Sequence, residues 1–344
     1  MICFANVSDI VSSKTGIWQR AQTENNDELA RLARELPRVM AGSKAPATVK
    51  AYTGGFSRWK TWATRQGIQP LPAEPYYVGL YLISVSQSVT SPSAIDSALF
   101  SLSWAHNISG LCDPAKDTCV KEISASLKRA LSGNKKKKEV FTIELLNKLE
   151  SITQPKNCLQ KMRLYMMCLL SFAGFLRFDE VSHLKYNEIT FESTHMVLFI
   201  AKSKTDQLRD GKNVVLAKCE GNNCPVENLK QYIKLADIKH GEEYLFRSLA
   251  KMKDGSFILR KKNQPVSYTV AREIFLKGIT DIGQDAKQFG LHSLRAGGAT
   301  VAANAGVSDR LLKRHGRWKS DSAKDGYIKD DIVSLLSVSQ TLGL

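Results

Sequence analysis

A run of four lysines, 135–138, follows Gly133-Asn134 and divides this chain of 344 residues into two parts. The two parts differ in the periodicity of their apolar residues. Four consecutive like charges cannot be buried together, and the preceding Gly-Asn favours a break in regular structure. We therefore expect a linker at this point, with a separately folded domain on each side of it. Two alternatives for the lysines are a contact with a phosphate backbone and a nuclear import signal.

The part before the linker has helical periodicity. The stretch NNDELARLARELPRVM predicts one amphipathic helix that ends before Gly42, and the next helix is expected to start with Thr48 as its cap. Apolar side chains recur at helical spacing in that next helix: Val49, Tyr52, Phe56, Trp59 and Trp62. Three further helical stretches follow, each bounded by Pro, Gly or Ser: PYYVGLYLISVSQSV, SPSAIDSALFSLSWAHNISG and DTCVKEISASLKRALSG. Together they predict a four-helix bundle.

The part after the linker combines helices with strands. Residues 142–152 and 158–174 predict helices, and the stretch ITFESTHMVLFIAKSKTDQLRDGKNVVLAK alternates apolar and polar residues around Arg209-Asp210-Gly211. This alternation predicts a β-hairpin or a three-stranded sheet. Helices are expected again at 225–236, 267–281, 292–305, 308–314 and 322–329. The fold class is therefore mainly α, with an N-terminal helical bundle and an α+β domain that contains one small antiparallel sheet.

The charge balance favours a polyanionic partner. Lysine and arginine total 49 against 33 aspartates and glutamates, a net charge of +16 at pH 7. Nucleic acid is the commonest partner of such a chain, and a solvated basic surface is the alternative. No apolar run reaches 18 residues, so no membrane span is expected.

The seven cysteines do not form an evident disulfide framework, because their number is odd and they are spread over a long chain. Cys219 and Cys224 are the closest pair. With no second pair and no nearby histidine they make a poor zinc site, so no metal is expected.

One candidate site residue is Arg177, which follows a long apolar run and the helix-breaking Gly174. An arginine at the end of a buried helix is costly unless it is paired or binds an anion. Glu180 lies three residues on, where it can hold the guanidinium. An Arg177–Glu180 ion pair without further role is the alternative.

A second candidate is the pair His292 and Arg295, whose spacing places both side chains on one helix face. The small residues Ala296, Gly297 and Gly298 are expected to leave that face uncluttered, which suits a tightly held oxyanion or phosphate. A solvated surface pair is the alternative.

Two further candidates are ordinary when taken alone. Lys204, in the stretch AKSKTD, is expected on the hairpin, where a lysine is usually just solvated. Tyr327, in KDGYI, is more typical of a packing residue than of a nucleophile.

Taken together, the order and spacing of these residues resemble the tyrosine recombinase (phage integrase) superfamily, over about residues 45 to 340. The stretch RHGRWKSDSAKDGYIKD, with CPV at Cys224, most resembles recombinases of eukaryotic mobile elements of the DIRS and Crypton kinds. The resemblance implies an N-terminal extension (1–45), a SAM-like helical core-binding domain that binds DNA (46–133), the basic linker (134–139) and a catalytic domain (140–344). It also implies that the apolar face of the final stretch, DDIVSLLSVSQTLGL, is a docking helix for a neighbouring protomer; folding back onto its own domain is the alternative.

The resemblance carries roles over to particular residues. The implied catalytic set is Arg177, Lys204, His292, Arg295, Trp318 and Tyr327, with Lys202 as the fallback for Lys204. Trp318 lies nine residues before Tyr327, at the family's sixth position, whereas His315 lies twelve before it and is out of register. Glu180 and His315 are supporting residues. The implied DNA contacts are Lys50, Arg58, Lys60, Lys135, Lys136, Lys137, Lys138, Lys202 and Arg314.

The implied reaction is site-specific recombination. Tyr327 attacks a DNA phosphodiester to give a 3′-phosphotyrosyl link and a free 5′-hydroxyl, and strands exchange through a Holliday junction. The implied partners are double-stranded DNA and further copies of the chain, a dimer on one site and a tetramer in the synaptic complex. No cofactor or metal is implied, and the location is intracellular with DNA, in the nucleus if the host is eukaryotic. The alternatives are a type IB topoisomerase-like nicking and resealing enzyme, and a catalytically idle DNA-binding protein.

Overall fold

The computed structural model describes residues 10, 16–133, 137–201, 210–239 and 241–342. The chain divides into two compact units, Met1–Lys136 and Lys137–Leu344. Each unit has its own apolar core. No helix in the described ranges is long and apolar enough to cross a membrane.

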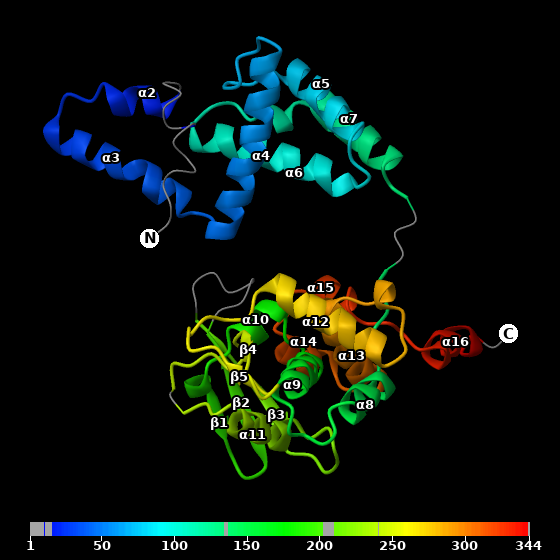
Figure 1. Ribbon diagram of the computed structural model, residues 1–344. Coiled ribbons are helices and arrows are strands. Elements are labelled where there is room, and N and C mark those ends of the chain that lie inside the picture. The colour runs from blue at the N-terminus through cyan, green and yellow to red at the C-terminus, as the bar shows by residue number, and fades with distance from the viewer. Residues whose placement is uncertain (1–9, 11–15, 134–136, 202–209, 240, 343–344) are drawn as a thin grey trace. The chain divides into compact units, whose positions relative to one another are not determined.

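The first unit is helical, as the sequence predicts (Figure 1). Its helices are α2 (Ile17–Gln22), α3 (Asp27–Ala41), α4 (Pro46–Arg65), α5 (Pro75–Ser86), α6 (Pro92–Ile108) and α7 (Thr118–Ala130). Helix α4 packs on α6, and α5 packs on α7. The predicted apolar face of α4 forms much of the core, because Val49, Phe56 and Trp59 are buried there.

The predicted start of α4 is wrong. The helix begins at Pro46 with Ala45 as its N-cap, and the Thr48 N–H donates to the Ala45 carbonyl at 2.9 Å inside the first turn. Proline suits the first helical position, because its fixed φ fits the helix and no intrahelical N–H bond is lost there. This preference outweighs the capping tendency of the threonine.

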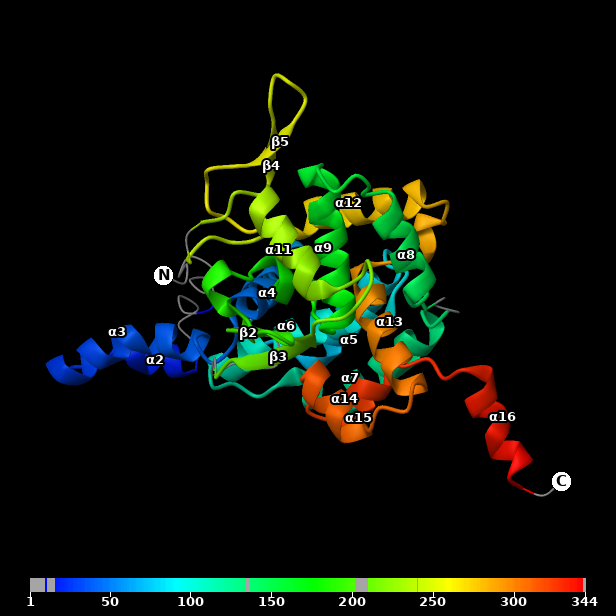
Figure 2. The same cartoon turned by 90° about the horizontal axis from the view of Figure 1, so that it is seen from below.

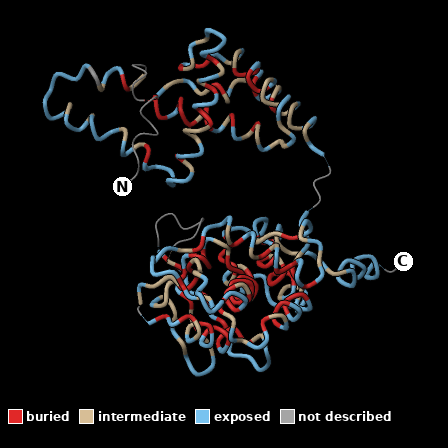
Figure 3. Tube along the Cα trace, in the orientation of Figure 1, coloured by how far each residue is buried: buried red, intermediate tan, exposed pale blue. Residues whose placement is uncertain are grey.

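The second unit combines helices with two small sheets. Its helices are α8 (Ile143–Ser151), α9 (Leu159–Ala173), α10 (Phe178–Ser182), α11 (Pro225–Leu235), α12 (Tyr268–Asp281), α13 (Leu291–Asn304), α14 (Asp309–Gly316), α15 (Asp321–Asp325) and α16 (Ile332–Gln340). Helix α9 lies at the centre and packs against α8, α11, α12 and α13. The buried residues of this unit, red in Figure 3, concentrate along it. The mainly α fold class is confirmed.

The larger sheet has the order β1 (Ile189–Phe191), β2 (His195–Ile200), β3 (Lys212–Ala217), all antiparallel. The sequence pattern predicts these strands. A second sheet, the hairpin of β4 (Leu249–Lys251) and β5 (Phe257–Leu259), was not predicted and is visible in Figure 2. Both strands of this hairpin have three residues, too few to show alternation, whereas β1 is continuous with the alternating pattern of β2 and β3.

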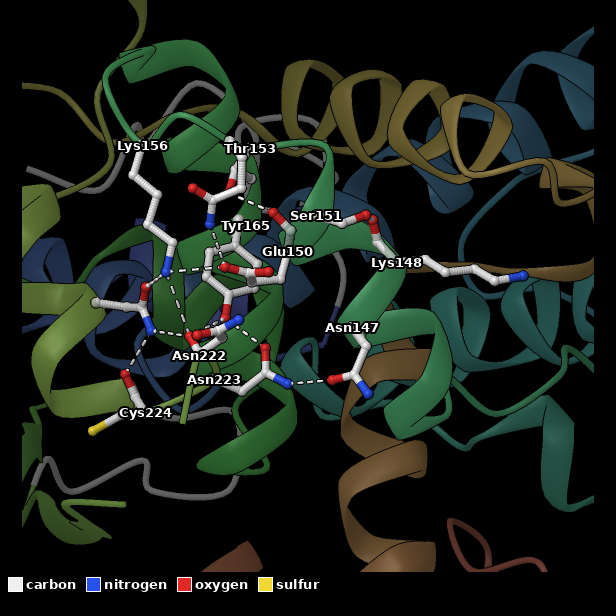
Figure 4. Close-up of polar contacts among 12 residues, drawn as sticks. Asn147, Lys148, Glu150, Ser151, Thr153, Lys156, Tyr165, Asn222, Asn223 and Cys224 are labelled. Carbon is white, nitrogen blue, oxygen red and sulfur yellow. Dashed lines mark hydrogen bonds and ion pairs between the residues drawn. The ribbon is translucent and has the colours of Figure 1, made fainter. Parts of the chain in front are cut away.

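A network of polar side chains fixes the loop of Asn222, Asn223 and Cys224 (Figure 4). The Lys156 ammonium lies 3.1 Å from a Glu150 carboxylate oxygen and donates to the Asn228 side chain at 2.8 Å. Asn228 in turn donates to the Asn222 carbonyl at 2.7 Å. These contacts tie the loop to the connection between α8 and α9. Among the described residues, no group of three His, Cys, Asp or Glu side chains could hold a metal ion.

The final helix, α16, keeps its apolar side chains exposed. Ile332, Val333 and Val338 retain 66%, 73% and 65% of their surface, and the helix is pale blue throughout in Figure 3. The apolar face that the resemblance implies for docking is thus uncovered among the described residues, and its docking on a neighbouring protomer stays a prediction.

Candidate active site

The site begins where α9 ends. Gly174 caps α9, and Phe175 has a φ of 45°, so the chain turns sharply before Arg177. The Arg177 Nη1 donates to Glu180 Oε1 at 2.8 Å, and the Arg177 backbone N–H donates to Glu180 Oε2, also at 2.8 Å. The predicted ion pair is thus present, and the Glu180 side chain is 1% exposed.

Arg295, on α13, is fully buried, which excludes a solvated surface pair with His292. Its Nη1 donates to the Phe175 carbonyl, and its Nη2 donates to the Gly316 carbonyl at 2.6 Å. Burial, together with the nearby charge of Arg177, lowers the pKa of the Arg295 guanidinium. Arg295 therefore fixes the end of α9 to the end of α14.

The expected role of the glycines after Arg295 is wrong. A Cβ on Gly297 would lie 1.8 Å from the Phe141 carbonyl oxygen, and one on Gly298 would lie 2.0 Å from that of Phe172. Both glycines are buried in the interior. They allow α13 to approach the neighbouring backbone and do not keep a ligand face open.

Tyr327 lies beside Arg295. The guanidinium carbon is 4.9 Å from the centre of the tyrosine ring, and the His292 ring is 6.4 Å from it. The helix predicted at 322–329 is too long, because α15 ends at Asp325 and Tyr327 follows in a turn. The buried Lys324, ion-paired with Asp309, holds this turn to the start of α14.

Trp318 fills the space between these groups. Its ring lies 4.6 Å from the Arg295 guanidinium carbon and 5.5 Å from the Tyr327 ring. The indole Nε1 is buried and has no hydrogen-bond partner within the described part of the chain. Such a donor is able to bind the oxygen of a ligand.

His315 is turned toward the protein interior. Its Nε2 donates to the Ala173 carbonyl at 2.9 Å, and its ring packs edge-on against Phe175 with a centroid distance of 4.6 Å. Burial lowers the pKa of His315. Of the two candidates for the sixth position, Trp318 packs against Tyr327, and no such contact is found for His315 among the described residues.

Sequence reasoning missed Arg317. Its side chain is 4% exposed, and its Nη2 donates to Glu180 Oε2 at 2.7 Å. The signal in the sequence is slight, because an arginine between Gly316 and Trp318 looks like any other basic residue of this stretch.

The charges of the cluster do not balance. Three guanidiniums, those of Arg177, Arg295 and Arg317, surround the single carboxylate of Glu180. Burying uncompensated positive charge is costly unless an anion completes the site. Two forked guanidiniums and an unpartnered indole N–H suit the non-bridging oxygens of a phosphodiester.

The other predicted residues belong to the first unit, have no contact with this cluster among the described contacts of the second unit, or fall outside the described residues. Lys50, Arg58, Lys137 and Arg314 are exposed and Lys60 is half-buried, while Lys138 is exposed and donates to the Lys287 carbonyl. Lys135, Lys136, Lys202 and Lys204 lie outside the described residues. The last two fall in the connection between β2 and β3.

Comparisons with known proteins agree with this architecture. The model of the phage integrase family matches residues 141–332. The chain is 28% identical over 315 residues to an integrase/recombinase XerD homologue of Selenomonas ruminantium, covering 90% of this chain and 89% of the relative. It is 22% identical over 280 residues to the recombinase Cre of Escherichia phage P1, covering 79% and 80%.

Solved structures share the fold at low sequence identity. XerH site-specific recombinase bound to palindromic difH substrate matches with a TM-score of 0.59 and 12% identity, covering 94% of this chain and 91% of that one. A lambda integrase dimer bound to a COC′ core site matches with a TM-score of 0.53 and 16% identity, covering 88% and 94%. The fold and the cluster of arginines around a tyrosine define a tyrosine recombinase. The chain belongs to the phage integrase family, whose model matches more than half of it.

Proposed function

We propose that this protein is a site-specific DNA recombinase that cleaves and rejoins DNA through a 3′-phosphotyrosyl intermediate and exchanges strands through a Holliday junction. The observation that carries the proposal is the Tyr327 ring against the Arg295 guanidinium, 4.9 Å away, in a cluster with excess positive charge. A tyrosine beside an anion-binding site is placed to attack the anion that binds there.

Each residue of the site has a distinct task in this reaction. The Tyr327 oxygen forms a bond to phosphorus, and the bond from phosphorus to the 5′-oxygen breaks. Arg177 and Arg295 donate to the non-bridging oxygens, where negative charge builds up in the transition state; loss of one such donor costs on the order of 10² in rate. Glu180 holds Arg177, and the Trp318 N–H provides a further donor but no titratable proton.

Two proton transfers complete the cycle. The leaving 5′-oxygen needs a proton, and we assign its delivery to Lys204, with Lys202 as the fallback. His292, whose ring lies 6.4 Å from that of Tyr327, either takes the tyrosine proton or hydrogen-bonds the phosphate. We assign no step to a metal or nucleotide cofactor, since the bond to tyrosine conserves the energy of the phosphodiester.

The rest of the chain binds DNA and further copies of itself in this proposal. Residues 46–133 form the core-binding domain, 134–139 the linker and 140–344 the catalytic domain, after an extension of residues 1–45. The basic residues Lys50, Arg58 and Arg314 contact DNA, consistent with their exposure. The exposed apolar face of α16 docks on a neighbouring protomer, within a dimer on one site and a tetramer in the synaptic complex.

The finer assignment is to mobile elements. We infer a recombinase of the DIRS or Crypton kind from RHGRWKSDSAKDGYIKD and from the CPV segment at Cys224. The protein then acts on DNA inside the cell, in the nucleus if its host is eukaryotic. Repeats in the DNA that flanks the coding sequence test this assignment, since they would name the element and its crossover site.

Trapping on a suicide substrate tests the function. A duplex nicked next to the cleavage site loses the short strand after attack, so the protein stays covalently joined to DNA. We expect the wild-type protein and Tyr76→Phe, which alters an exposed tyrosine of α5, to form adducts, and Tyr327→Phe to form none. Adducts that persist in Tyr327→Phe would refute the proposal. Supercoil relaxation without exchange between two sites would instead indicate a topoisomerase.

A further inference from the structure

Arg317 occupies an unusual backbone position. It follows the last residue of α14 with φ 57° and ψ 34°, the left-handed region that usually holds glycine. Its guanidinium is nevertheless buried, since the side chain is 4% exposed. An L-residue stays in this conformation only when its surroundings hold it there.

The Arg317 side chain connects two parts of the site. Its Nη1 donates to the carbonyls of His315, at 2.9 Å, and Gly174, at 3.3 Å. Its Nη2 donates to the Phe175 carbonyl at 3.2 Å and to Glu180 Oε2 at 2.7 Å. The segment that leads to Trp318 and Tyr327 is thereby joined to the segment that carries Arg177.

Glu180 is shared between two arginines. Arg177 donates to its Oε1 at 2.8 Å, while Arg317 donates to its Oε2. Burial by itself would raise the pKa of the Glu180 carboxyl, but the charge of Arg317 and the hydrogen bond from the Arg177 backbone outweigh it and lower that pKa. Glu180 is therefore ionised. Without Arg317, its negative charge would be paired with Arg177 alone.

We propose that Arg317 is a positioning residue for phosphate activation: it neutralises Glu180 and fixes residues 174 and 175, so that the positive charge of Arg177 remains available to the scissile phosphate. The inference rests on the proposed function for its DNA substrate. Both terminal nitrogens of Arg317 already donate two hydrogen bonds each, to backbone carbonyls and to Glu180, so its effect on the phosphate passes through Glu180 and Arg177.

Cleavage by substituted proteins provides the first test. In Arg317→Met, we expect single-turnover adduct formation on a suicide substrate to slow by about tenfold or more, the effect of about one charge-assisted hydrogen bond, with DNA affinity within about threefold of wild type. Arg310→Met removes an exposed arginine of α14, the helix that Arg317 follows, and serves as the matched control. A merely structural role would lower affinity, cleavage and thermal stability together.

A double variant guards against misfolding. Glu180→Gln combined with Arg317→Met removes the buried carboxylate together with the arginine that pairs with it. Replacing both partners of a buried ion pair is better tolerated than replacing one. We expect this double variant to form adducts faster than Arg317→Met alone, and Arg317→Lys to restore part of the rate. A double variant slower than Arg317→Met would overturn the inference.

Binding of inorganic phosphate provides a test that does not need DNA cleavage. Phosphate bound at the cluster stabilises the folded state, so at a fixed phosphate concentration tighter binding gives a larger rise in melting temperature. We expect the phosphate-induced shift to be retained in Arg310→Met and largely lost in Arg317→Met. If the wild type forms no adducts but this difference is seen, the proposed function fails while the role of Arg317 stands. Equal shifts in both variants, or no shift in the wild type, would overturn the role of Arg317.

Discussion

Replacing Trp318 with phenylalanine separates the chemistry of this site from its packing. The ring that contacts Arg295 and Tyr327 is largely kept, whereas the indole N–H is removed. That N–H is buried without a partner in the described part of the chain. Its removal therefore costs no hydrogen bond in the free protein, but it removes a donor from the complex with a phosphate.

The two expected effects differ in size. A buried unpartnered donor costs about 1–3 kcal/mol, so removing it is stabilising. The smaller ring leaves a void of about 40 Å³, which at about 24 cal/mol per Å³ costs about 1 kcal/mol. The free energy of unfolding should thus stay within about 1 kcal/mol of the wild-type value or rise above it. The lost bond to an anionic oxygen is worth about 1.5–3 kcal/mol, so cleavage should slow about 10- to 100-fold.

The assay combines urea unfolding with single-turnover adduct formation. Trp104→Phe is the matched control, because the Trp104 Nε1 is also buried without a partner in the described residues but lies in the first unit. Trp104→Phe should change the free energy of unfolding by a similar amount. Its rate of cleavage should equal that of the wild type. Wild-type cleavage by Trp318→Phe, or a loss of more than about 3 kcal/mol in its stability, would refute the reasoning.

Three further substitutions have defined outcomes. His315→Ala should lose less cleavage than Trp318→Ala, because the His315 ring donates to a carbonyl and does not approach Tyr327 in the described contacts. Equal losses of adduct formation in the two variants would contradict that ranking. Gly298→Ala should lower the free energy of unfolding in urea by about 1–3 kcal/mol, because the new Cβ would meet the Phe172 carbonyl oxygen at 2.0 Å; an unchanged midpoint would contradict the close packing of α13. Burial lowers the pKa of His106, so the unfolded state binds more protons and the first unit should lose stability as the pH falls below about 6.5. His106→Gln should flatten this dependence between pH 7.5 and pH 5, and an unchanged slope would count against the neutral buried imidazole.

Local patterns predict most of the helices because each is amphipathic and has clear breaks. The apolar spacing in α4 and the alternation in β2 and β3 reflect which side of each element faces the core. The order of apolar and polar residues within each segment is enough to show that side. The start of α4 was misplaced because proline and threonine compete within three residues. The β4–β5 hairpin was missed because both of its strands have three residues and neither adjoins a longer alternating strand.

The parts of the site that were not predicted depend on contacts between distant segments. The role of Arg317 depends on its contact with Glu180, which lies 137 residues earlier in the chain. The close approach of Gly297 and Gly298 to neighbouring backbone likewise comes from the packing of α13, not from its own sequence. Arg177 and Glu180 could be paired in advance because they are three residues apart on a short helix.

The identity of the residue joined to DNA tests the central claim most directly. Trypsin cleaves after Lys324 and Lys329, so the attacking tyrosine lies in a peptide of five residues, Asp325–Lys329. Mass spectrometry of adducts trapped on a suicide substrate should find this peptide joined through Tyr327 to a 3′-phosphate. DNA joined to any other residue, or joined through a 5′-phosphate, would contradict the account.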